Sequence, residues 1–278
     1  MGVRIIVDSS ADLASEYKEQ VDIVPMTLTF GTEEFVDGVS IGKDDFYAKL
    51  ENCDILPKTS QIPPADFEKV FGELSRAGET AVVITVASEL SGTWQNACLA
   101  AEDYPGIYVV DSHNASVGAG ILAEYAVRCV NQGMQAEELA LRLNEVSKEI
   151  RVIARLDTLD YLKKGGRIST TAALAAGVLN IKPVISIEGG QIVVLGKARG
   201  SKKANNLLVE KVAEEGIDFS RPILLGYTGL SDALLQDYVR SSRQLWEGQT
   251  CKLDQTQLGS IIGTHAGPGA VAVAFFAK

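Results

Sequence analysis

Residues 81–101, AVVITVASELSGTWQNACLAA, contain an apolar run, a short polar turn and a segment of helical periodicity, in that order. A short apolar run bounded by turn residues is typical of a buried strand, and apolar residues repeating every three to four positions are typical of an amphipathic helix. A strand that turns directly into a helix is the repeating unit of parallel α/β sheets. This stretch therefore predicts an α/β fold with a helix N-terminus at the sheet edge.

The same alternation continues on both sides of this unit. Strand-like runs lie at residues 4–7, 22–30 and 107–110, and helix-like segments at 43–50, 65–74, 120–130 and 136–150. Such alternation produces right-handed βαβ units with helices on both faces of the sheet. We therefore expect residues 1–158 to form a three-layer α/β/α domain with a mainly parallel sheet.

The pattern changes after residue 158. Strand-like runs at 181–187, 191–194 and 270–276 accompany helix-like segments at 208–215 and 232–245. Glu188-Gly189-Gly190 separates the first two runs and is typical of a hairpin turn, which indicates antiparallel pairing. We expect residues 159–278 to form a two-layer α/β domain with a mixed sheet.

Length and composition agree with two domains. The chain has 278 residues, of which 46% are hydrophobic, and a domain takes about 150 residues. Its apolar runs fall well below the roughly 18 residues of a membrane span, and its first residues lack a signal-peptide pattern, so we expect no integral membrane segment and a cytoplasmic location. The four cysteines form no C-x-x-C pair, and we expect no metal site.

Charge is unevenly distributed. The net charge is −10, yet residues 161–211 carry nine basic and two acidic side chains, hence +7, which leaves −17 for the remainder. An acidic remainder repels a phosphate backbone, so binding to nucleic acid is disfavoured. Within the basic window, Arg167 and Arg199 each follow a glycine-containing basic turn, a pattern that suits phosphate recognition but also an ordinary solvated surface.

Three segments carry candidate binding residues. Ser91 precedes a helix, where its hydroxyl could assist in binding an anion or could simply cap the helix. Thr59 and Ser60 lie in a polar loop between prolines, as oriented donors or as turn formers. His265 lies in the glycine-rich segment 263–269, which we expect to be a loop where the backbone bends sharply. It could donate to an anion, attack a substrate or be structural.

Seven short motifs in register resemble those of the DegV family, and together they span the chain. They are residues 6–13, 59–61, 90–93, 110–112, 162–168, 182–184 and 263–269. Two departures concern the ligand site. The proline that usually follows Thr59-Ser60-Gln61 is displaced by Ile62, and Trp94 stands where a smaller aromatic side chain is common.

The resemblance implies a DegV-like two-domain protein that holds one long-chain fatty acid, such as palmitate, stearate or oleate, in a tunnel at the domain interface. It implies that Thr59 and Ser91 bind the carboxylate, with Ser60 and His265 close by. Arg167 and Arg199 would contact the partner or the transferred phosphate. The implied partner is an ATP-dependent fatty acid kinase subunit that converts the acid to an acyl phosphate, so the chain itself would be a non-enzymatic carrier without a cofactor.

Other hypotheses remain open at this point. The family fold is similar to one subunit of dihydroxyacetone kinase, and a small-molecule kinase subunit or a hydrolase could use His265 or Ser91 directly. No G-x-S-x-G elbow surrounds Ser91, which disfavours the hydrolase. Proximity to the motifs suggests Phe30, Ile62 and Trp94 as tunnel walls.

Overall fold

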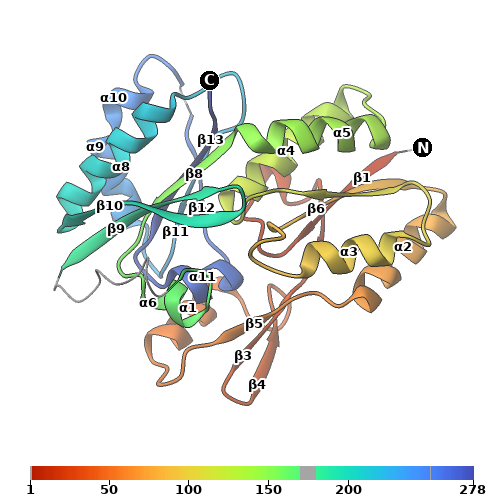
Figure 1. Ribbon diagram of the computed structural model, residues 1–278, viewed down its shortest axis with the longest axis horizontal. Helices are drawn as coiled ribbons and strands as arrows, with labels where there is room; N and C mark the ends of the chain where they lie inside the picture. Colours follow the sequence, from red (N-terminus) through yellow and green to blue (C-terminus); the bar gives the residue numbers. More distant parts are fainter. Residues whose placement is uncertain (1, 170–179, 251) are drawn as a thin grey trace.

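The computed structural model describes residues 2–169, 180–250 and 252–278. A four-stranded parallel sheet forms the centre of the N-terminal half (Figure 1). Its order is β2-β1-β6-β7, with β1 (Val3–Asp8), β2 (Asp22–Val24), β6 (Thr80–Thr85) and β7 (Ile107–Asp111). The strand order reverses between β1 and β6, and at such a point a crevice opens outside the carboxyl ends of the strands.

Helices cover both faces of this sheet. Helices α2 (Pro64–Ala77) and α3 (Thr93–Ala101) pack on one face, and α4 (Val117–Asn131) and α5 (Ala136–Val146) on the other (Figure 1). Proline at the start of α2 and Gly78 with φ +68° after its end match the usual asymmetry of helix termini. The expected α/β class with a parallel N-terminal sheet is confirmed.

A small antiparallel sheet lies beside the parallel sheet and was absent from the sequence-based prediction. Its order is β4-β3-β5, with β3 (Thr27–Phe30), β4 (Glu33–Val36) and β5 (Lys58–Ser60), and α1 (Lys43–Glu51) lies between β4 and β5 in sequence. The single strand predicted at 22–30 is wrong, because the chain leaves the parallel sheet after Val24 and enters the small sheet at Thr27. Pro25, which has no N–H for a sheet hydrogen bond, lies at the break.

The C-terminal half contains a six-stranded mixed sheet. Its order is β10-β9-β8-β13-β11-β12, with β8 (Ile150–Arg155), β9 (Ile181–Glu188), β10 (Gln191–Arg199), β11 (Leu224–Tyr227), β12 (Asp254–Gln257) and β13 (Val271–Phe276). The β11–β12 pair is parallel and the other pairs are antiparallel, so the mixed sheet is confirmed. Strand β8 already belongs to this sheet, whereas the boundary at residue 158 stays a prediction.

Helices α8 (Ser201–Glu215), α9 (Ala233–Ser241) and α10 (Arg243–Trp246) accompany this sheet, and α8 and α9 pack on it. The helix predicted at 232–245 is two helices. Ser242 separates them, and its hydroxyl bonds the carbonyl of Tyr238 at 2.7 Å and accepts a bond from the Trp246 indole at 2.8 Å. Such a side chain competes with the helical pattern of the backbone. The helix predicted at 136–150 ends at Val146, and a 3₁₀ turn, Ser147–Glu149, leads into β8.

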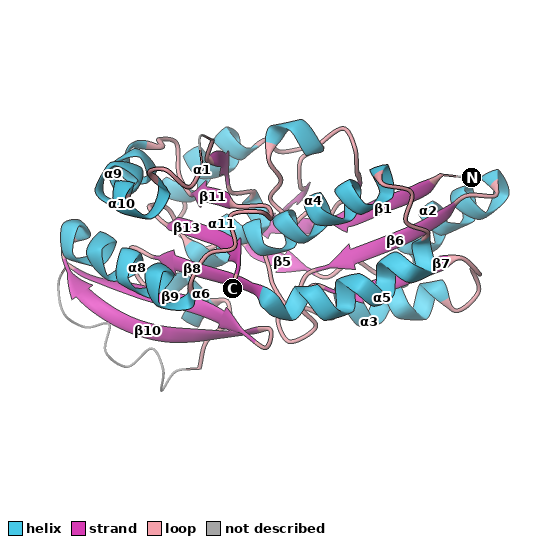
Figure 2. Cartoon of the chain, turned by 90° about the horizontal axis from the view of Figure 1, so that it is seen from above, coloured by secondary structure: helices cyan, strands magenta, loops and turns pink. Residues whose placement is uncertain are grey.

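Helix α4 joins the two halves because it contacts strands of both large sheets, which lie next to each other along the molecule (Figure 2). Two glycines permit this close packing. A Cβ on Gly120 would lie 1.9 Å from the carbonyl oxygen of Asp12, and one on Gly118 would lie 2.4 Å from Val152 Cγ2. The G-x-G pattern at this helix start thus serves packing between helix and sheets. Among the described residues, no helix is both long and apolar enough to cross a bilayer.

Candidate functional site

A cavity of about 260 Å³ lies between the two large sheets. Its wall includes Ser10, two residues after the end of β1, and Val86, which directly follows β6, so the cavity opens at the switch point of the parallel sheet. Strand β5, the inner face of the six-stranded sheet and the short helix α11 (Ser260–Ala266) complete the wall.

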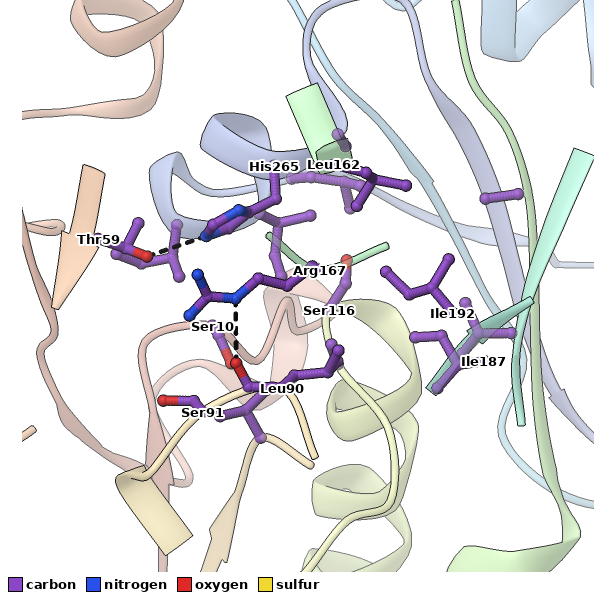
Figure 3. Close-up of a pocket in the computed structure, with 18 of the residues that line it drawn as sticks. Ser10, Thr59, Leu90, Ser91, Ser116, Leu162, Arg167, Ile187, Ile192 and His265 are labelled. Carbon is purple, nitrogen blue, oxygen red and sulfur yellow. Dashed lines mark hydrogen bonds between the residues drawn. The ribbon is translucent and has the colours of Figure 1, made fainter. Parts of the chain in front are cut away.

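The two ends of the cavity differ in chemistry (Figure 3). Thr59, Ser91, Arg167 and His265 lie around one end, and Ile187 and Ile192 lie at the other. The wall between these ends is largely apolar. It includes Met26, Val86, Leu90, Val152, Ala154, Leu156, Ile185, Leu258 and Ile261. Such a cavity suits a molecule with one anionic end and a long apolar body.

Thr59 and Ser60 lie on strand β5, not in the loop that the sequence suggested. Thr59 pairs with Leu28 and Ser60 with Thr27 in the antiparallel register of the small sheet, which fixes the backbone that carries both hydroxyls. Both residues line the cavity. The sequence reasoning missed this strand because three residues next to a proline provide no alternating apolar pattern.

Gln61 and Gly92 bring the β5 segment against the start of α3. A Cβ on Gly92 would lie 2.2 Å from Gln61 Oε1, so the glycine makes room for the glutamine side chain. Asn96 Nδ2 donates to the carbonyl of Ile62 at 2.8 Å and strengthens the same contact. The two motifs that contain Thr59 and Ser91 are therefore adjacent in the fold, although these two residues are 32 positions apart in the sequence.

The sequence left open whether the Ser91 hydroxyl caps a helix or helps to bind an anion, and its position in the structure is compatible with both. Its Oγ accepts a bond from the backbone N–H of Thr93 at 3.3 Å and lies 2.9 Å from Thr93 Oγ1, as in a local cap of α3. Ser91 also lines the cavity at its polar end, as Figure 3 shows. A hydroxyl keeps its donor capacity while its oxygen accepts from the backbone, so Ser91 can still donate to a ligand.

His265 lies in the last turn of α11, where the sequence suggested a glycine-rich loop. Its Nε2 lies 2.9 Å from Thr59 Oγ1, and its Nδ1 is buried without a hydrogen-bond partner among the described residues. Burial, and to a smaller extent the nearby positive charge of Arg167, lower the pKa of His265 to about 4. The imidazole is therefore neutral at pH 7.

Glycines explain how a helix so short reaches the cavity. A Cβ on Gly165 would lie 2.3 Å from His265 Nδ1, and one on Gly263 would lie 2.6 Å from Phe46 Cε1 in α1. Gly267, with φ +69°, ends α11 and lies so close to Tyr161 that a Cβ would approach its ring within 2.3 Å. The glycine-rich motif therefore allows α11 to pack against both α1 and α6 (Asp160–Lys164).

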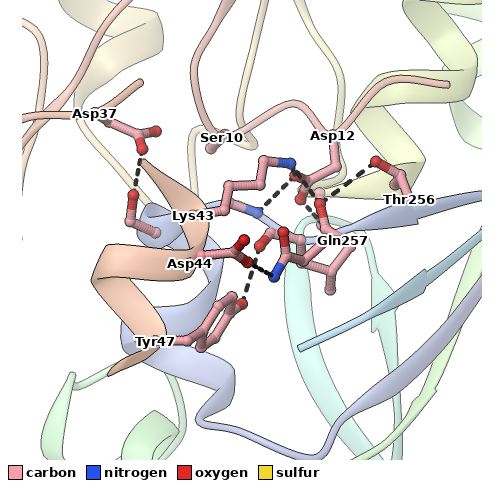
Figure 4. Close-up of polar contacts among 12 residues, drawn as sticks. Ser10, Asp12, Asp37, Lys43, Asp44, Tyr47, Thr256 and Gln257 are labelled. Atoms are coloured by element: carbon pink, nitrogen blue, oxygen red, sulfur yellow. Dashed lines mark hydrogen bonds and ion pairs between the residues drawn. The ribbon is translucent and has the colours of Figure 1, made fainter. Parts of the chain in front are cut away.

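Buried polar groups of the N-terminal half hold the start of α11 (Figure 4). The Asp12 carboxylate accepts bonds from the Gly259 N–H at 2.7 Å and from Ser116 Oγ at 2.9 Å, and it pairs with Lys43 Nζ at 3.2 Å. Ser260 Oγ donates to Asp37, whose pKa is raised by burial. These contacts fix the position of the helix that carries His265.

The two arginines that the sequence singled out lie in different places. Arg167 lines the cavity, with Nε donating to the carbonyl of Leu90 at 3.1 Å and Nη1 to that of Gly165 at 2.6 Å. It also lines an adjoining hollow of about 330 Å³ with Lys58 and Lys164. Arg199 is exposed at the end of β10 and is not among the described residues that line either space.

Sequence reasoning missed most of the apolar wall. Phe30, Ile62 and Trp94 are not among the described residues that line the cavity, whereas Ile185 and Ile187 are. The alternation of these two isoleucines on β9 was the available signal, but which face meets the cavity depends on the packing of the two sheets. Within the described part of the chain, no cluster of His, Cys, Asp or Glu is arranged to hold a metal ion.

Comparison with known proteins identifies the family. The family model of the uncharacterised DegV proteins matches residues 2–278. A DegV domain-containing protein of Caldanaerobacter subterraneus subsp. tengcongensis is 34% identical, with 99% of each chain covered. A fatty acid-binding protein of Thermotoga maritima is 31% identical, with 98% of this chain and 96% of that protein covered.

The fold agrees with this relationship. The crystal structure of a DegV lipid-binding protein from Thermotoga maritima superposes with a TM-score of 0.87 at 29% identity, covering 100% of this chain and 99% of that one. From the matched family model, the relatives and the shared fold, the chain belongs to the DegV family.

Proposed function

We propose that this chain binds one long-chain fatty acid in the cavity between its two large sheets, as a carrier without catalytic activity of its own. The observation that carries the proposal is the cavity itself, which has hydroxyls, a neutral imidazole and a guanidinium at one end and an apolar wall beyond them. Relatives described as fatty acid-binding and lipid-binding proteins support the same ligand class.

In this proposal, Thr59 and Ser91 donate hydrogen bonds to the carboxylate, with Ser60 and His265 close by. His265 Nδ1 has no acceptor among the described residues, and a buried N–H without an acceptor is rare, so we assign the ring proton to Nε2. Nε2–H then donates to Thr59 Oγ1, 2.9 Å away. The Thr59 hydroxyl proton then remains available for the ligand. His265 therefore donates to Thr59, and Thr59 donates to the carboxylate.

The first experiment is denaturing extraction of freshly purified protein, with mass spectrometry of the organic phase. We expect one fatty acid per chain. An extract without fatty acid, together with no uptake of added palmitate, stearate or oleate, contradicts the proposal.

Ser91→Ala tests the assignment of the polar end. The variant loses one charge-assisted hydrogen bond, which is worth about 1.5–3 kcal/mol, so its affinity for palmitate should fall at least about tenfold. Titration of delipidated protein measures this, and Ser88→Ala, a serine in the same connection that is not among the described lining residues, is the matched control. Equal affinities of the Ser91 variant and the wild type would contradict the role of Ser91.

We further propose that the chain presents the carboxylate to an ATP-dependent fatty acid kinase subunit, which would make an acyl phosphate, and that it does so in the cytoplasm, where ATP is available. Support comes from the basic hollow next to Thr59 and His265, to which Lys58, Lys164 and Arg167 contribute. Arg199 would contact the same partner from the end of β10. Loaded protein, mixed with such a kinase and ATP, should yield acyl phosphate, and no product above that of free fatty acid would contradict this step.

The alternative of a hydrolase or small-molecule kinase finds less support in the geometry. A hydrolase needs a base that contacts the Ser91 nucleophile, with an acidic group behind that base. His265 instead contacts Thr59. Asp111, an aspartate that could act as the acidic group of such a triad, accepts bonds from the N–H groups of Ser88 and His113. We expect neither esterase activity nor ATP hydrolysis from the isolated chain.

A further inference from the structure

Two isoleucine side chains lie at the apolar end of the cavity. Ile187 on β9 and Ile192 on β10 are direct cross-strand partners, so both side chains lie on the same face of the hairpin. Both line the cavity at the end away from Thr59 and His265, as Figure 3 shows. A molecule with its polar group at Thr59 therefore extends its apolar end toward this pair.

The N-terminal half fixes the hairpin that carries the pair. A Cβ on Gly190 at the hairpin turn would lie 3.3 Å from Ala87 Cβ and 3.2 Å from Glu89 Cγ, so the turn rests on the connection after β6. Gln191 Nε2 also donates to Glu89 at 3.3 Å. The end of the cavity is thus held by both halves of the molecule.

Behind Ile187 lies a second, larger hollow of about 550 Å³. Ile187 lines both spaces, and neighbouring residues divide between them: Ala115 lines the cavity and Asn114 the hollow, while Val152 lines the cavity and Arg151 the hollow. Alternate residues of a strand point to opposite faces, so the two spaces lie on opposite faces of the six-stranded sheet. The β8–β9 pairs run from Arg155↔Val184 to Ile153↔Ser186, so Ile187, only 9% exposed, lies just beyond them, where it lines both spaces.

The hollow has a mixed lining. Lys148, Ser186 and Glu188 provide polar groups, whereas Ile150, Ile153 and Leu195 provide apolar surface. A hydrocarbon chain that reached past Ile187 would find apolar contact there. With Ile187 in place, the end of the chain meets a branched side chain first.

We propose that Ile187 is the specificity-determining residue that sets the maximum length of the bound acyl chain. This rests on the proposed fatty acid binding and adds to it a length limit and its location. Affinity should rise about fourfold for each added CH₂ until the terminal methyl reaches Ile187 and should level off or fall for longer chains.

The test is a titration of delipidated protein with saturated fatty acids of even length from 12 to 24 carbons. In Ile187→Ala the shorter side chain leaves space at the apolar end of the cavity, and the length at which affinity stops rising should increase by at least two carbons. The affinity of the first acid beyond the wild-type limit, relative to that at the limit, should improve about tenfold or more, since two CH₂ groups enter apolar surroundings.

Ile185→Ala is the matched control. Ile185 has the same side chain and lies two residues earlier on the same face of β9, but it lines the cavity without lining the hollow. Its loss should weaken binding at every length and leave the limit unchanged. Ile187→Phe places a larger side chain at the apolar end and should shorten the acyl chain at which affinity stops rising. It provides a second test if the alanine variant fails to fold.

The outcomes separate the two proposals. A wild type that binds no acid of any length overturns the proposed function. A wild type that binds, with the same length limit in Ile187→Ala and in Ile187→Phe, overturns the role of Ile187 and leaves the proposed function intact. If the maximum acyl length increases equally in Ile185→Ala, the proposed role of Ile187 is also overturned, because that length would then depend on general packing of the cavity wall.

Discussion

His265 is a neutral imidazole in a setting where a histidine would often be charged. Burial beside α6 and the positive charge of Arg167 both disfavour protonation, so the ring acts as a hydrogen-bonding group at pH 7. This avoids placing a buried cation beside the half-buried Arg167, a cation that would need its own counter-ion. The polar end of the cavity can therefore bind an anion through hydroxyl and imidazole donors, with Arg167 as the nearby full charge.

The lowered pKa of His265 predicts a pH dependence of stability. The unfolded chain has a histidine pKa near 6.5 and the folded chain one of about 4, so the unfolded state binds more protons between these values. The neutral His265 therefore contributes about 3 kcal/mol to the free energy of unfolding. This contribution is fully present above pH 6.5 and is lost as the pH falls toward 4. Urea unfolding of delipidated protein from pH 7 to pH 4 should show this loss in the wild type.

His265→Gln separates this contribution from that of the buried carboxyl groups. Glutamine retains a side-chain N–H for Thr59 but does not titrate, so the difference between wild type and variant should change with pH only between about 6.5 and 4. A difference that stays constant over that range would show that His265 takes up protons equally well in the folded state.

At the scale of the element, α11 shows how a short helix can be held in place by its neighbours. It has seven residues, too few for a stable helix on its own, and its position depends on Asp12, Asp37 and the close approach of α1. The sequence-based interpretation of 263–269 as a bend was reasonable, because glycines at 263, 267 and 269 are typical of loops. Tertiary packing overrides that preference here.

Gly263→Ala should destabilise the folded protein by about 1–3 kcal/mol, because the new Cβ overpacks a core that cannot move. It would lie 2.6 Å from Phe46 and 2.7 Å from the Tyr47 hydroxyl, and both side chains are fully buried. Urea unfolding measures the change. Gly42→Ala is the control, since its Cβ meets no atom closer than 3.7 Å, and it should cost less than about 1 kcal/mol.

Most strands that the sequence predicted have a clear apolar signal, and three that it missed lack one. The buried strands β8 and β11, with the sequences IRVIAR and LLGY, were missed despite such a signal. Strands β1, β6, β9 and β13 are apolar runs and were found. Strands β4, β5 and β12 have the sequences EEFV, KTS and DQTQ, and each lies at an edge of its sheet, where polar residues are tolerated. Pairing with a neighbour, not local preference, makes these segments strands.

The site shows the same division. Thr59, Ser91, Arg167 and His265 were singled out from four separate motifs, and all four lie at one end of one cavity. The polar side chains of these four residues and the glycines near them in the motifs were enough to single them out from the sequence. The isoleucines of the far end were missed, because an apolar residue on a strand looks the same whether it meets a helix or a ligand.

At the scale of the whole molecule, ligand binding and stability should be linked, since residues from both halves of the chain line the cavity. A ligand present at 100 times its dissociation constant stabilises the folded state by about 2.7 kcal/mol. Adding palmitate to delipidated protein should therefore raise the melting temperature by about 5 °C or more, as measured by differential scanning fluorimetry.

Hexadecanol, which has the same chain length but no carboxylate, is the control ligand. It should produce a clearly smaller shift, because it forms no charge-assisted bonds with the polar end. An equal shift from the alcohol would mean that the chain recognises the alkyl tail alone.

The central pair of the six-stranded sheet also has a consequence for synthesis of the protein. Strand β13 (Val271–Phe276) pairs with β8 (Ile150–Arg155), and 116 residue positions separate Arg155 from Val271. At about 5–20 residues per second, a ribosome needs roughly 6–23 s to make that interval. During this time, Val152 and Ala154 lie on a strand with one unpaired edge, which is open to wrong pairing between nascent chains. The yield of folded protein in a cell therefore depends on how well that interval is protected, for instance by chaperones or a lower growth temperature, as well as on the stability of the finished fold.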